Sequence, residues 1–238
     1  MPSIHGILRR TYNGLNKLIA RRLLRQFATF RQEGLQLDGL GRGDGTWVVP
    51  ANLIRKDAVC YCVGVGDDAT FDMALADRGA RVFSFDPTPR AIRYMQNLDF
   101  NHERITFTPI GIWNENKKLK FFAPMNRDHV NLSVRDIHGT GEYFEVDCRR
   151  LRDVMGEFGH DHLDLLKLDI EGAWFEVLQD VVKERIPVSI LCVEFDSPTS
   201  LVKSLRIIRE LKKIGLQLVH QDRDNFLFLK DDLINGAA

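Results

Sequence analysis

The strongest constraint on the fold is a pair of apolar strand patterns separated by a glycine turn and a helical pattern. The first strand pattern, residues 59–63, meets a turn at Gly64 and Gly66. The second, residues 81–85, ends in Asp86 at the spacing of about 20 residues that a ribose-binding acid has in such units. A glycine turn lets a cofactor approach the backbone, and an acid after the next strand can hold ribose hydroxyls. The segment therefore predicts a βαβ unit that binds a cofactor containing an adenosine.

Strand and helix patterns alternate along the rest of the chain, which predicts a mainly parallel sheet with helices on both faces. The strand patterns cover residues 59–63, 81–85, 104–108, 163–168, 188–194, 216–220 and 225–229. The helical patterns cover residues 69–78, 89–98, 149–158, 173–185 and 200–213. Only residues 221–224 separate the last two strands, so these strands must pair as an antiparallel hairpin. Five parallel strands followed by a hairpin is the chain order of class I methyltransferases, a Rossmann-like α/β fold with seven strands.

Size and composition favour one domain. The chain has 238 residues, of which 44% are hydrophobic, enough for one full core. No apolar run approaches the roughly 20 residues needed to cross a bilayer, and the N-terminus lacks the apolar core of a secretory signal. Four cysteines lie in strand-like apolar segments: Cys60, Cys62, Cys148 and Cys192. Cys60 and Cys62 have no nearby Cys or His partners, so we expect buried reduced thiols, no metal site and a cytoplasmic protein.

The N-terminal part has a different character. Residues 1–32 contain basic residues but no acid, although the formal net charge of the chain is +0. Their apolar residues recur at steps of three or four, which predicts a basic amphipathic helix within an extension over residues 1–37. Such a helix can lie on an anionic membrane surface or dock on a partner, or it can pack on its own domain with its arginines in water. An arginine-rich, acid-free start is also typical of organelle transit peptides, which would change the localisation.

The boundaries of the main domain are expected at residues 46 and 230. Glycines at positions 39, 41, 43 and 45 predict a flexible connection over residues 38–46, and residues 231–238 are expected to form a tail. Inside the domain, residues 110–148 interrupt the alternation with short β-like pieces. An insertion after the third strand would lie beside a site at the carboxyl ends of the strands.

The glycine turn alone does not identify the cofactor. Gly64-x-Gly66-x-x-Ala69 satisfies the dinucleotide fingerprint, in which a pyrophosphate rests on the start of the following helix. Here Asp67 and Asp68 occupy that position, where a carboxylate and a pyrophosphate about 5 Å apart would repel by several kcal/mol. S-adenosylmethionine has no phosphate, and its ammonium and sulfonium groups attract carboxylates. The two aspartates can equally cap the helix, which is compatible with cofactor binding, so an NAD-dependent oxidoreductase remains the alternative.

The chain resembles the FkbM family of S-adenosylmethionine-dependent methyltransferases. Four segments carry the resemblance: Gly-Val-Gly-Asp-Asp-Ala-Thr-Phe-Asp (64–72), Phe-Asp-Pro-Thr-Pro (85–89), Asp-Leu-Leu-Lys-Leu-Asp-Ile-Glu-Gly-Ala (164–173) and Val-Glu-Phe-Asp (193–196). The segments 47–50 and 126–133 are also similar, so that the resemblance spans about residues 45–230. Many family members have an acid where this chain has Cys62 and a glycine where it has Asp68.

The resemblance implies which residues hold the cofactor. The methionine part would lie against Gly64, Gly66 and Asp67. The ribose hydroxyls would bind Asp86, and Thr88 would cap the next helix or touch the adenosine. The adenine would lie by the loop after the third strand, at Ile110 and Gly111.

Catalytic candidates follow the fourth strand of the predicted sheet. Asp169 and Glu171 lie at its carboxyl end, where ligands bind in open α/β sheets, and each could remove the proton of an alcohol acceptor. Asp169 is also a candidate cofactor ligand. Structural roles are open for both, with Asp169 paired to Lys167 and Glu171 capping the next helix. His129, in the inserted region, is a further candidate base, and Glu194 a candidate acceptor ligand.

These observations predict an S-adenosylmethionine-dependent O-methyltransferase that acts on a sugar, a glycan or a similar polar metabolite. The acceptor class is implied by the resemblance. A non-catalytic adaptor with a methyltransferase-like fold is a second alternative. We expect no nucleic-acid partner, and the predicted location is the cytoplasm, with possible peripheral contact of residues 1–32 with a membrane or a protein.

Overall fold

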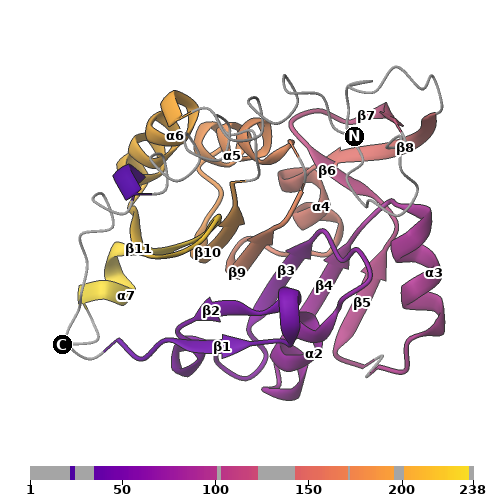
Figure 1. The fold of residues 1–238 in the computed structure, drawn as a ribbon, viewed down its shortest axis with the longest axis horizontal. Helices are drawn as coiled ribbons and strands as arrows, with labels where there is room; N and C mark the ends of the chain where they lie inside the picture. The colour runs from indigo at the N-terminus through magenta and orange to yellow at the C-terminus, as the bar shows by residue number, and fades with distance from the viewer. Residues whose placement is uncertain are drawn as a thin grey trace, which may run out of the picture.

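The computed structural model describes residues 22–24, 35–100, 103–122, 143–170, 172–195 and 201–235. Their centre is a seven-stranded sheet (Figure 1). Its strands are β3 (Val59–Val63), β4 (Arg81–Phe85), β5 (Ile105–Thr108), β9 (Leu163–Leu168), β10 (Val188–Glu194), β11 (Leu216–Asp222) and β12 (Asn225–Lys230). The helices that flank it are α2 (Thr70–Asp77), α3 (Pro89–Asn97), α4 (Leu151–Glu157), α5 (Trp174–Lys183), α6 (Leu201–Lys213) and α7 (Asp231–Asn235).

The strand order of this sheet is β11-β12-β10-β9-β3-β4-β5. Strands β3, β4, β5, β9 and β10 are parallel, whereas β12 runs antiparallel to both β10 and β11. The predicted class I methyltransferase architecture with its C-terminal hairpin is therefore confirmed. The central parallel strands β3, β9 and β10 are almost entirely buried, as in the fully buried run Val59–Val63, which explains why their sequences are mostly apolar.

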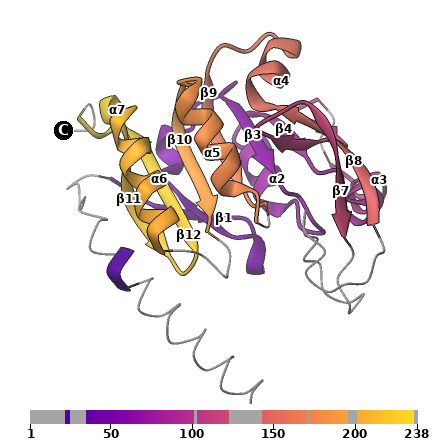
Figure 2. The same ribbon diagram turned by 90° about the horizontal axis from the view of Figure 1, so that it is seen from above.

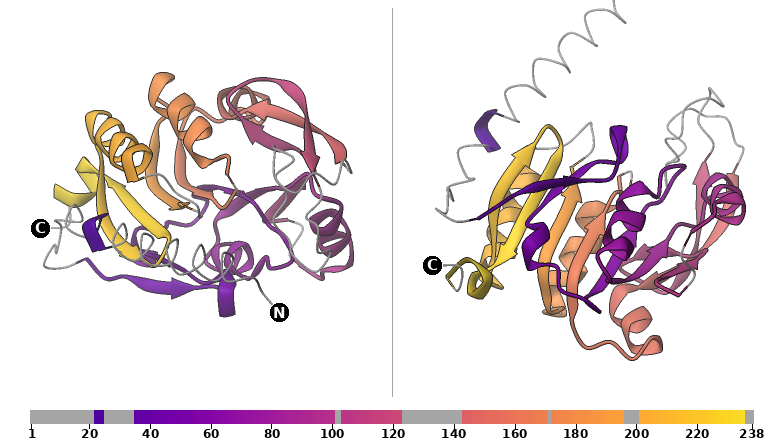
Figure 3. Two further views of the ribbon diagram at one scale, coloured as in Figure 1. Left: turned by 45° about the horizontal axis from the view of Figure 1, so that its top comes forward. Right: turned by 90° about the horizontal axis from the view of Figure 1, so that it is seen from below.

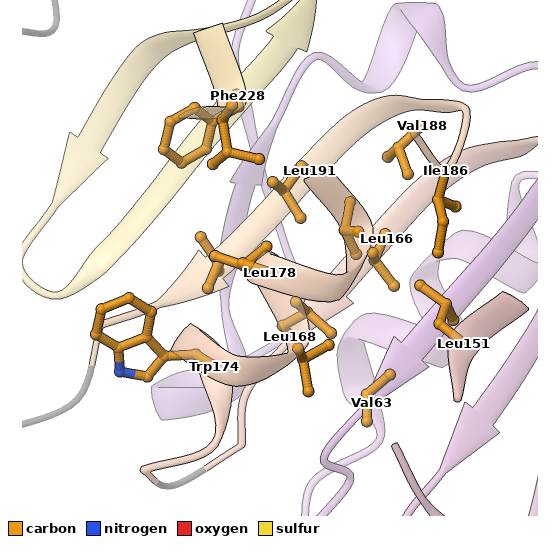
Figure 4. Close-up of a cluster of buried hydrophobic side chains, with 14 of the residues drawn as sticks. Val63, Leu151, Leu166, Leu168, Trp174, Leu178, Ile186, Val188, Leu191 and Phe228 are labelled. Atoms are coloured by element: carbon orange, nitrogen blue, oxygen red, sulfur yellow. The ribbon is translucent and has the colours of Figure 1, made fainter. Parts of the chain in front are cut away.

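The sheet separates two hydrophobic clusters. On one face, α4, α5 and α6 pack on residues such as Leu166 and Leu191, and Figure 4 shows these side chains with Leu151 and Leu178 from the helices. On the other face, α2, α3 and α7 cover a second cluster that includes Cys60. All four cysteines are buried free thiols, as the sequence predicts. Burial raises the pKa of Cys192 to about 12.

The order of the strands determines where a ligand can bind. From β3 the chain moves outward through β4 to β5, and then it returns to β9 on the opposite side of β3. The connections after β3 and β9 therefore diverge at the carboxyl edge of the sheet. This switch point is where open α/β sheets form their ligand crevice.

The inserted region forms a small sheet of its own. The strands are β6 (Gly111–Trp113), β7 (Lys117–Phe122) and β8 (Tyr143–Arg150), in the order β6-β8-β7. The β-like pieces expected at 119–122 and 144–148 lie within β7 and β8. Figure 2 shows β7 and β8 beside α3, at the end of the molecule away from β11. The small sheet thus lies on the β4–β5 side of the switch point.

The prediction of a flexible connection over residues 38–46 is wrong. The chain forms an antiparallel hairpin of β1 (Asp38–Leu40) and β2 (Trp47–Val49), joined through a 3-10 turn at Gly43–Gly45. Leu40, Trp47 and Val49 are at most 3% exposed and belong to the cluster under α2. Glycines supply the turn, and the flanking apolar residues bury their side chains, so this segment is part of the domain. The view from below in Figure 3 shows the hairpin lying across the sheet.

Both ends of the described chain pack on the domain. The expected tail contains α7, in which Ile234 is 4% exposed, because its apolar side chain completes the cluster under α2. Of the expected N-terminal helix only a short piece lies in the described part, and there Leu24 is 3% exposed and belongs to the cluster under α4–α6. Within the described ranges, none of the helices has the length and hydropathy that a membrane-spanning segment requires.

Candidate functional site

A cavity of about 520 Å³ opens at the switch point, at the carboxyl ends of β3, β4 and β9. This volume lies in the range of small-molecule and cofactor sites. The lining residues come from the turn after β3, the loop after β4, strand β6, the end of β9 and the hairpin β1–β2. They include Gly45, Gly64, Val65, Gly66, Asp67, Asp68, Phe71, Asp86, Pro87, Thr88, Gly111, Ile112, Trp113, Lys167, Asp169, Ile170 and Ala173.

The turn after β3 is held directly against the end of β9. Gly64 has a φ of 88°, and a Cβ at this position would overlap the carbonyl oxygen of Asp169. The Asp169 N–H donates to the Val63 carbonyl at 2.9 Å, and the Gly64 N–H donates to the Phe85 carbonyl at 2.9 Å. A side chain would be excluded here by both conformation and space, so glycine is required at position 64.

Asp86 fixes the other side of the same turn. Its carboxylate accepts hydrogen bonds from the backbone N–H groups of Val65 at 2.9 Å, Gly66 at 2.8 Å and Thr88 at 2.8 Å. A carboxylate has about four acceptor positions, so these three donors leave about one for a ligand. Asp86 is 5% exposed and lines the cavity, and its contact with the ribose stays a prediction.

Thr88 is the N-cap residue of helix α3. Its hydroxyl oxygen accepts the N–H of Ala91 at 3.2 Å, and Pro89 follows it at the first position of the helix. This is the capping role predicted for Thr88. Because Thr88 also lines the cavity, it remains a candidate for contact with the adenosine.

The two aspartates before helix α2 already supply negative charge at its start. Asp67 forms an ion pair with Arg90 of α3. Asp68 accepts hydrogen bonds through Oδ1 from the Thr70 N–H at 2.9 Å and the Thr70 hydroxyl at 2.6 Å. A pyrophosphate at this helix start would therefore meet carboxylates, which disfavours a dinucleotide.

A buried lysine joins the turn to the end of β9. Lys167 is 4% exposed, donates to the Gly64 carbonyl at 2.5 Å and lies 3.3 Å from the carboxylate of Asp169. Burial alone lowers the pKa of Lys167, but the neighbouring carboxylates of Asp169 and Asp72 outweigh it, so the pKa lies above its usual value. The ring of Trp47 lies 5.5 Å from the ammonium group. Lys167 is thus a fixed cation under the cavity.

The charge of the cavity favours a cationic ligand. Four carboxylates line it, from Asp67, Asp68, Asp86 and Asp169, against the single ammonium of Lys167 among the described lining residues. A low-dielectric pocket with one predominant sign of charge attracts ligands of the opposite sign. The cavity therefore fits a positively charged adenosine derivative better than a dinucleotide.

Most predicted site residues come together at this cavity. Those that line it are Gly64, Gly66, Asp67, Asp86, Thr88, Gly111 and Asp169. Ile110 does not, because it packs against the hydrophobic cluster under α4. Glu194 lies at the last position of β10 opposite Asn225, outside the lining that the described residues form. His129 and Glu171 lie outside the described residues.

The cavity is also lined by residues that the sequence patterns did not indicate as site residues. Ile112 and Trp113 extend the wall beyond Gly111, and Phe71 contributes from helix α2. Gly45 belongs to the segment interpreted as a connection. The similarity of residues 47–50 was the one signal in the sequence that pointed to this part of the chain.

The chain is similar to one family of proteins and to several individual proteins. The family model described as "Methyltransferase FkbM domain" matches residues 58–215. Over 206 residues the chain is 26% identical to probable methyltransferase-like protein 24 of Rattus norvegicus, covering 79% of this chain and 50% of that protein. The Homo sapiens protein of the same name is 25% identical with the same coverage. The chain thus spans about half the length of the curated relatives it matches.

Solved structures with a similar fold include two fibrillarins. One is Aeropyrum pernix fibrillarin in complex with natively bound S-adenosyl-L-methionine, at 14% identity and a TM-score of 0.44, covering 86% of this chain and 85% of that chain. The other is a pre-rRNA processing fibrillarin of Methanococcus jannaschii, at 10% identity and a TM-score of 0.46, covering 84% and 85%.

Proposed function

The chain belongs to the FkbM methyltransferase family, and from this premise we propose that it is an S-adenosylmethionine-dependent O-methyltransferase. The proposed acceptor is a hydroxyl of a sugar, a glycan or a similar polar metabolite. One observation carries the choice of cofactor: the glycine turn opens into a cavity whose described lining contains four carboxylates and one ammonium group. The acceptor class is supported by the resemblance to the family.

The residues present fit this cofactor. Asp86, Thr88 and Gly111, on the β4–β5 side, would hold the adenosine. Gly64 and Gly66 would let the methionine part lie close to the backbone. Because S-adenosylmethionine lacks a phosphate, the carboxylates at the start of α2 attract it instead of repelling it.

Bound S-adenosylmethionine supplies an electrophilic methyl group. The protein then has to align an acceptor oxygen and remove its proton. We assign the proton to the carboxylate of Asp169, which lines the cavity and is 37% exposed. Lys167, 3.3 Å away, holds this carboxylate at the end of β9. Trp113 also lines the cavity, and we propose that the apolar face of a sugar packs against its ring.

The role of Asp169 predicts the kinetics of Asp169→Asn. We expect kcat to fall by roughly 10²- to 10⁴-fold, the usual contribution of a general base, while affinity for S-adenosylhomocysteine stays within about twofold. Single-turnover assays and calorimetry measure the two quantities separately. If the affinity for S-adenosylhomocysteine fell together with kcat, Asp169 would be a cofactor ligand. Full retention of kcat would mean that another residue is the general base. The variants His129→Ala and Glu171→Gln would then test the two other candidates.

The methyltransferase activity itself is tested by binding and transfer. Isothermal titration should show S-adenosylhomocysteine bound with a Kd below the millimolar range and no binding of NAD. Isotope-labelled methyl groups should then appear on members of a panel of neutral sugars and glycans. Binding of NAD alone would favour the oxidoreductase. Binding of S-adenosylhomocysteine without transfer to any acceptor would favour a non-catalytic adaptor, and transfer only to amines would contradict the hydroxyl acceptor.

A further inference from the structure

A row of polar side chains crosses the main sheet at a level where it is completely buried. In the register of the strands, Lys167 of β9 lies between Cys62 of β3 and Cys192 of β10. Ser84 of β4 is the next residue beyond Cys62. All four side chains are at most 4% exposed, and burial raises the pKa of both thiols, which therefore stay neutral. Such positions of a parallel sheet are normally apolar, so packing alone does not explain the row.

Helix α2 adds a carboxylate to this row. Asp72, which is 2% exposed, accepts the hydroxyl of Ser84 at 2.5 Å and the thiol of Cys62. Burial raises the pKa of Asp72, whereas the ammonium of Lys167 and these two donors stabilise its ionised form. A carboxylate is costly in a protein core unless it is both paired with an opposite charge and hydrogen-bonded. Asp72 meets both conditions.

The ammonium of Lys167 therefore has two carboxylates for its single positive charge. Asp169 lies 3.3 Å from it and lines the cavity, whereas Asp72 is not part of the lining that the described residues form. Burial lowers the pKa of Lys167, but both carboxylates raise it, so that it lies above its usual value. With both carboxylates ionised, the cluster of Asp72, Lys167 and Asp169 has one excess negative charge. It can accept one proton and become neutral.

We propose that Asp72 is a positioning residue for methyl transfer: its carboxylate balances Lys167 and leaves Asp169 able to take the acceptor's proton. The inference rests on the proposed function. In the transfer, the acceptor oxygen forms a bond to the methyl carbon, and the bond between that carbon and the sulfonium sulfur breaks, with its electron pair left on sulfur. The O–H proton goes to the Asp169 carboxylate. Proton uptake thus removes the excess negative charge of the cluster as the positive charge of the sulfonium disappears.

Without Asp72, the ammonium of Lys167 would act on Asp169 alone. Proton uptake would then leave a positive charge under the cavity. A lone ammonium favours the ionised form of a nearby carboxylate and makes it a weaker base. The other charged groups of the described lining are the carboxylates of Asp67, Asp68 and Asp86. These are the same with and without Asp72, so the difference comes from the buried pair.

Nuclear magnetic resonance of protein labelled with ¹³C at the aspartate carboxyl groups tests this without cofactor or acceptor. Asp169→Asn identifies the resonance of Asp169. In Asp72→Asn, whose amide oxygen can still accept the Ser84 hydroxyl, we expect Asp169 to take up its proton at a pH lower by about one unit. Asp180→Asn is the matched control, because Asp180 is also buried, at 6% exposed, but pairs with Arg150 outside the described cavity lining. It should leave the titration of Asp169 unchanged.

The effect of Asp72 should also depend on the lysine. In a Lys167→Met background we expect Asp72→Asn to have no effect on Asp169, because a buried Asp72 without its counter-ion is itself protonated. Equal titration of Asp169 in the wild type and in Asp72→Asn would overturn the proposal. A protonated Asp72 or a neutral Lys167 in the wild type at neutral pH would also overturn it, and this measurement needs no variant of Asp72 to fold.

Kinetics with an acceptor from the transfer assay give a second readout. Asp72→Asn should lower kcat roughly 3- to 10-fold and move the acidic limb of its pH profile to lower pH. The Kd of S-adenosylhomocysteine should stay within about twofold. A loss of affinity with an unchanged pH profile would give Asp72 only a structural role and contradict the proposal. Failure of the wild type to bind S-adenosylhomocysteine would refute the proposed cofactor instead, while the titration still decides whether Asp72 acts on Asp169.

Discussion

Among single residues, Gly64 has the most restricted environment at the site. Its φ of 88° and its contact with the Asp169 carbonyl both exclude a side chain. We expect Gly64→Ala to destabilise the protein by roughly 3 kcal/mol, the sum of backbone strain and overpacking. Gly66 also has a positive φ of 59°, but a Cβ there would meet no atom within 4 Å.

Gly66→Ala is therefore the matched control for this prediction. It should cost only about 1 kcal/mol, the conformational term alone. Urea denaturation of the two variants measures the difference. Equal costs would show that the contact between the turn after β3 and the end of β9 contributes nothing to stability.

Among the secondary-structure elements, strand β8 is joined to helix α5 by an ion-pair network. Arg150, at the end of β8, donates to the Asp180 carboxylate at 2.8 and 3.3 Å and to Glu184 at 2.8 Å. Asp180 is only 6% exposed, whereas Arg150 is 26% exposed. These hydrogen bonds raise the pKa of Arg150. The network connects the small inserted sheet to the layer of helices on the main sheet.

This network predicts a large effect of Arg150→Met. The variant leaves the buried Asp180 carboxylate without its donor, so we expect a loss of about 3 kcal/mol in the free energy of unfolding. Arg149→Met is the control, because Arg149 pairs with Glu157 in a more exposed position, where such pairs are worth less than about 1 kcal/mol. Chemical denaturation checks both. A small effect of Arg150→Met would mean that water replaces the lost donor.

For the whole molecule, the N-terminal segment over residues 1–32 differs most in charge from the rest of the chain. We propose that residues 1–32 place the protein at the anionic surface of a membrane facing the cytoplasm, because they carry basic side chains and no acid. Near such a surface each Lys or Arg contributes about 1 kcal/mol. The burial of Leu24 in the main core indicates that part of this segment also contacts the domain.

Sedimentation with vesicles tests this proposal on the full chain. Vesicles containing phosphatidylserine should bind the protein, and pure phosphatidylcholine vesicles should not. Replacement of Arg9, Arg10, Arg21 and Arg22 by Gln should abolish the binding, and raised salt should weaken it. Absence of binding to both kinds of vesicle would mean that the segment serves only the domain or a protein partner.

The sequence by itself determined the order of the strands of the main sheet along the chain and of the helices between them. Periodicity and loop length are local properties, so the bounds of β3, β4, β9 and β10 and the hairpin β11–β12 could be predicted from them. The glycine turn and Asp86 were also recognisable, because their spacing along the chain is fixed by the βαβ unit.

Tertiary structure decided how each charged group is used. The four aspartates of the cavity look alike in the sequence, but each has its partner in a different element. The partner lies in α3 for Asp67, at the start of α2 for Asp68, in the glycine turn for Asp86 and in β9 for Asp169. The hairpin β1–β2 was missed for the same reason, since its apolar residues gain their partners only from distant helices and strands. Hydrogen bonds and packing between distant segments leave no periodic trace in the sequence. For that reason only the folded structure shows which partner each of these carboxylates has.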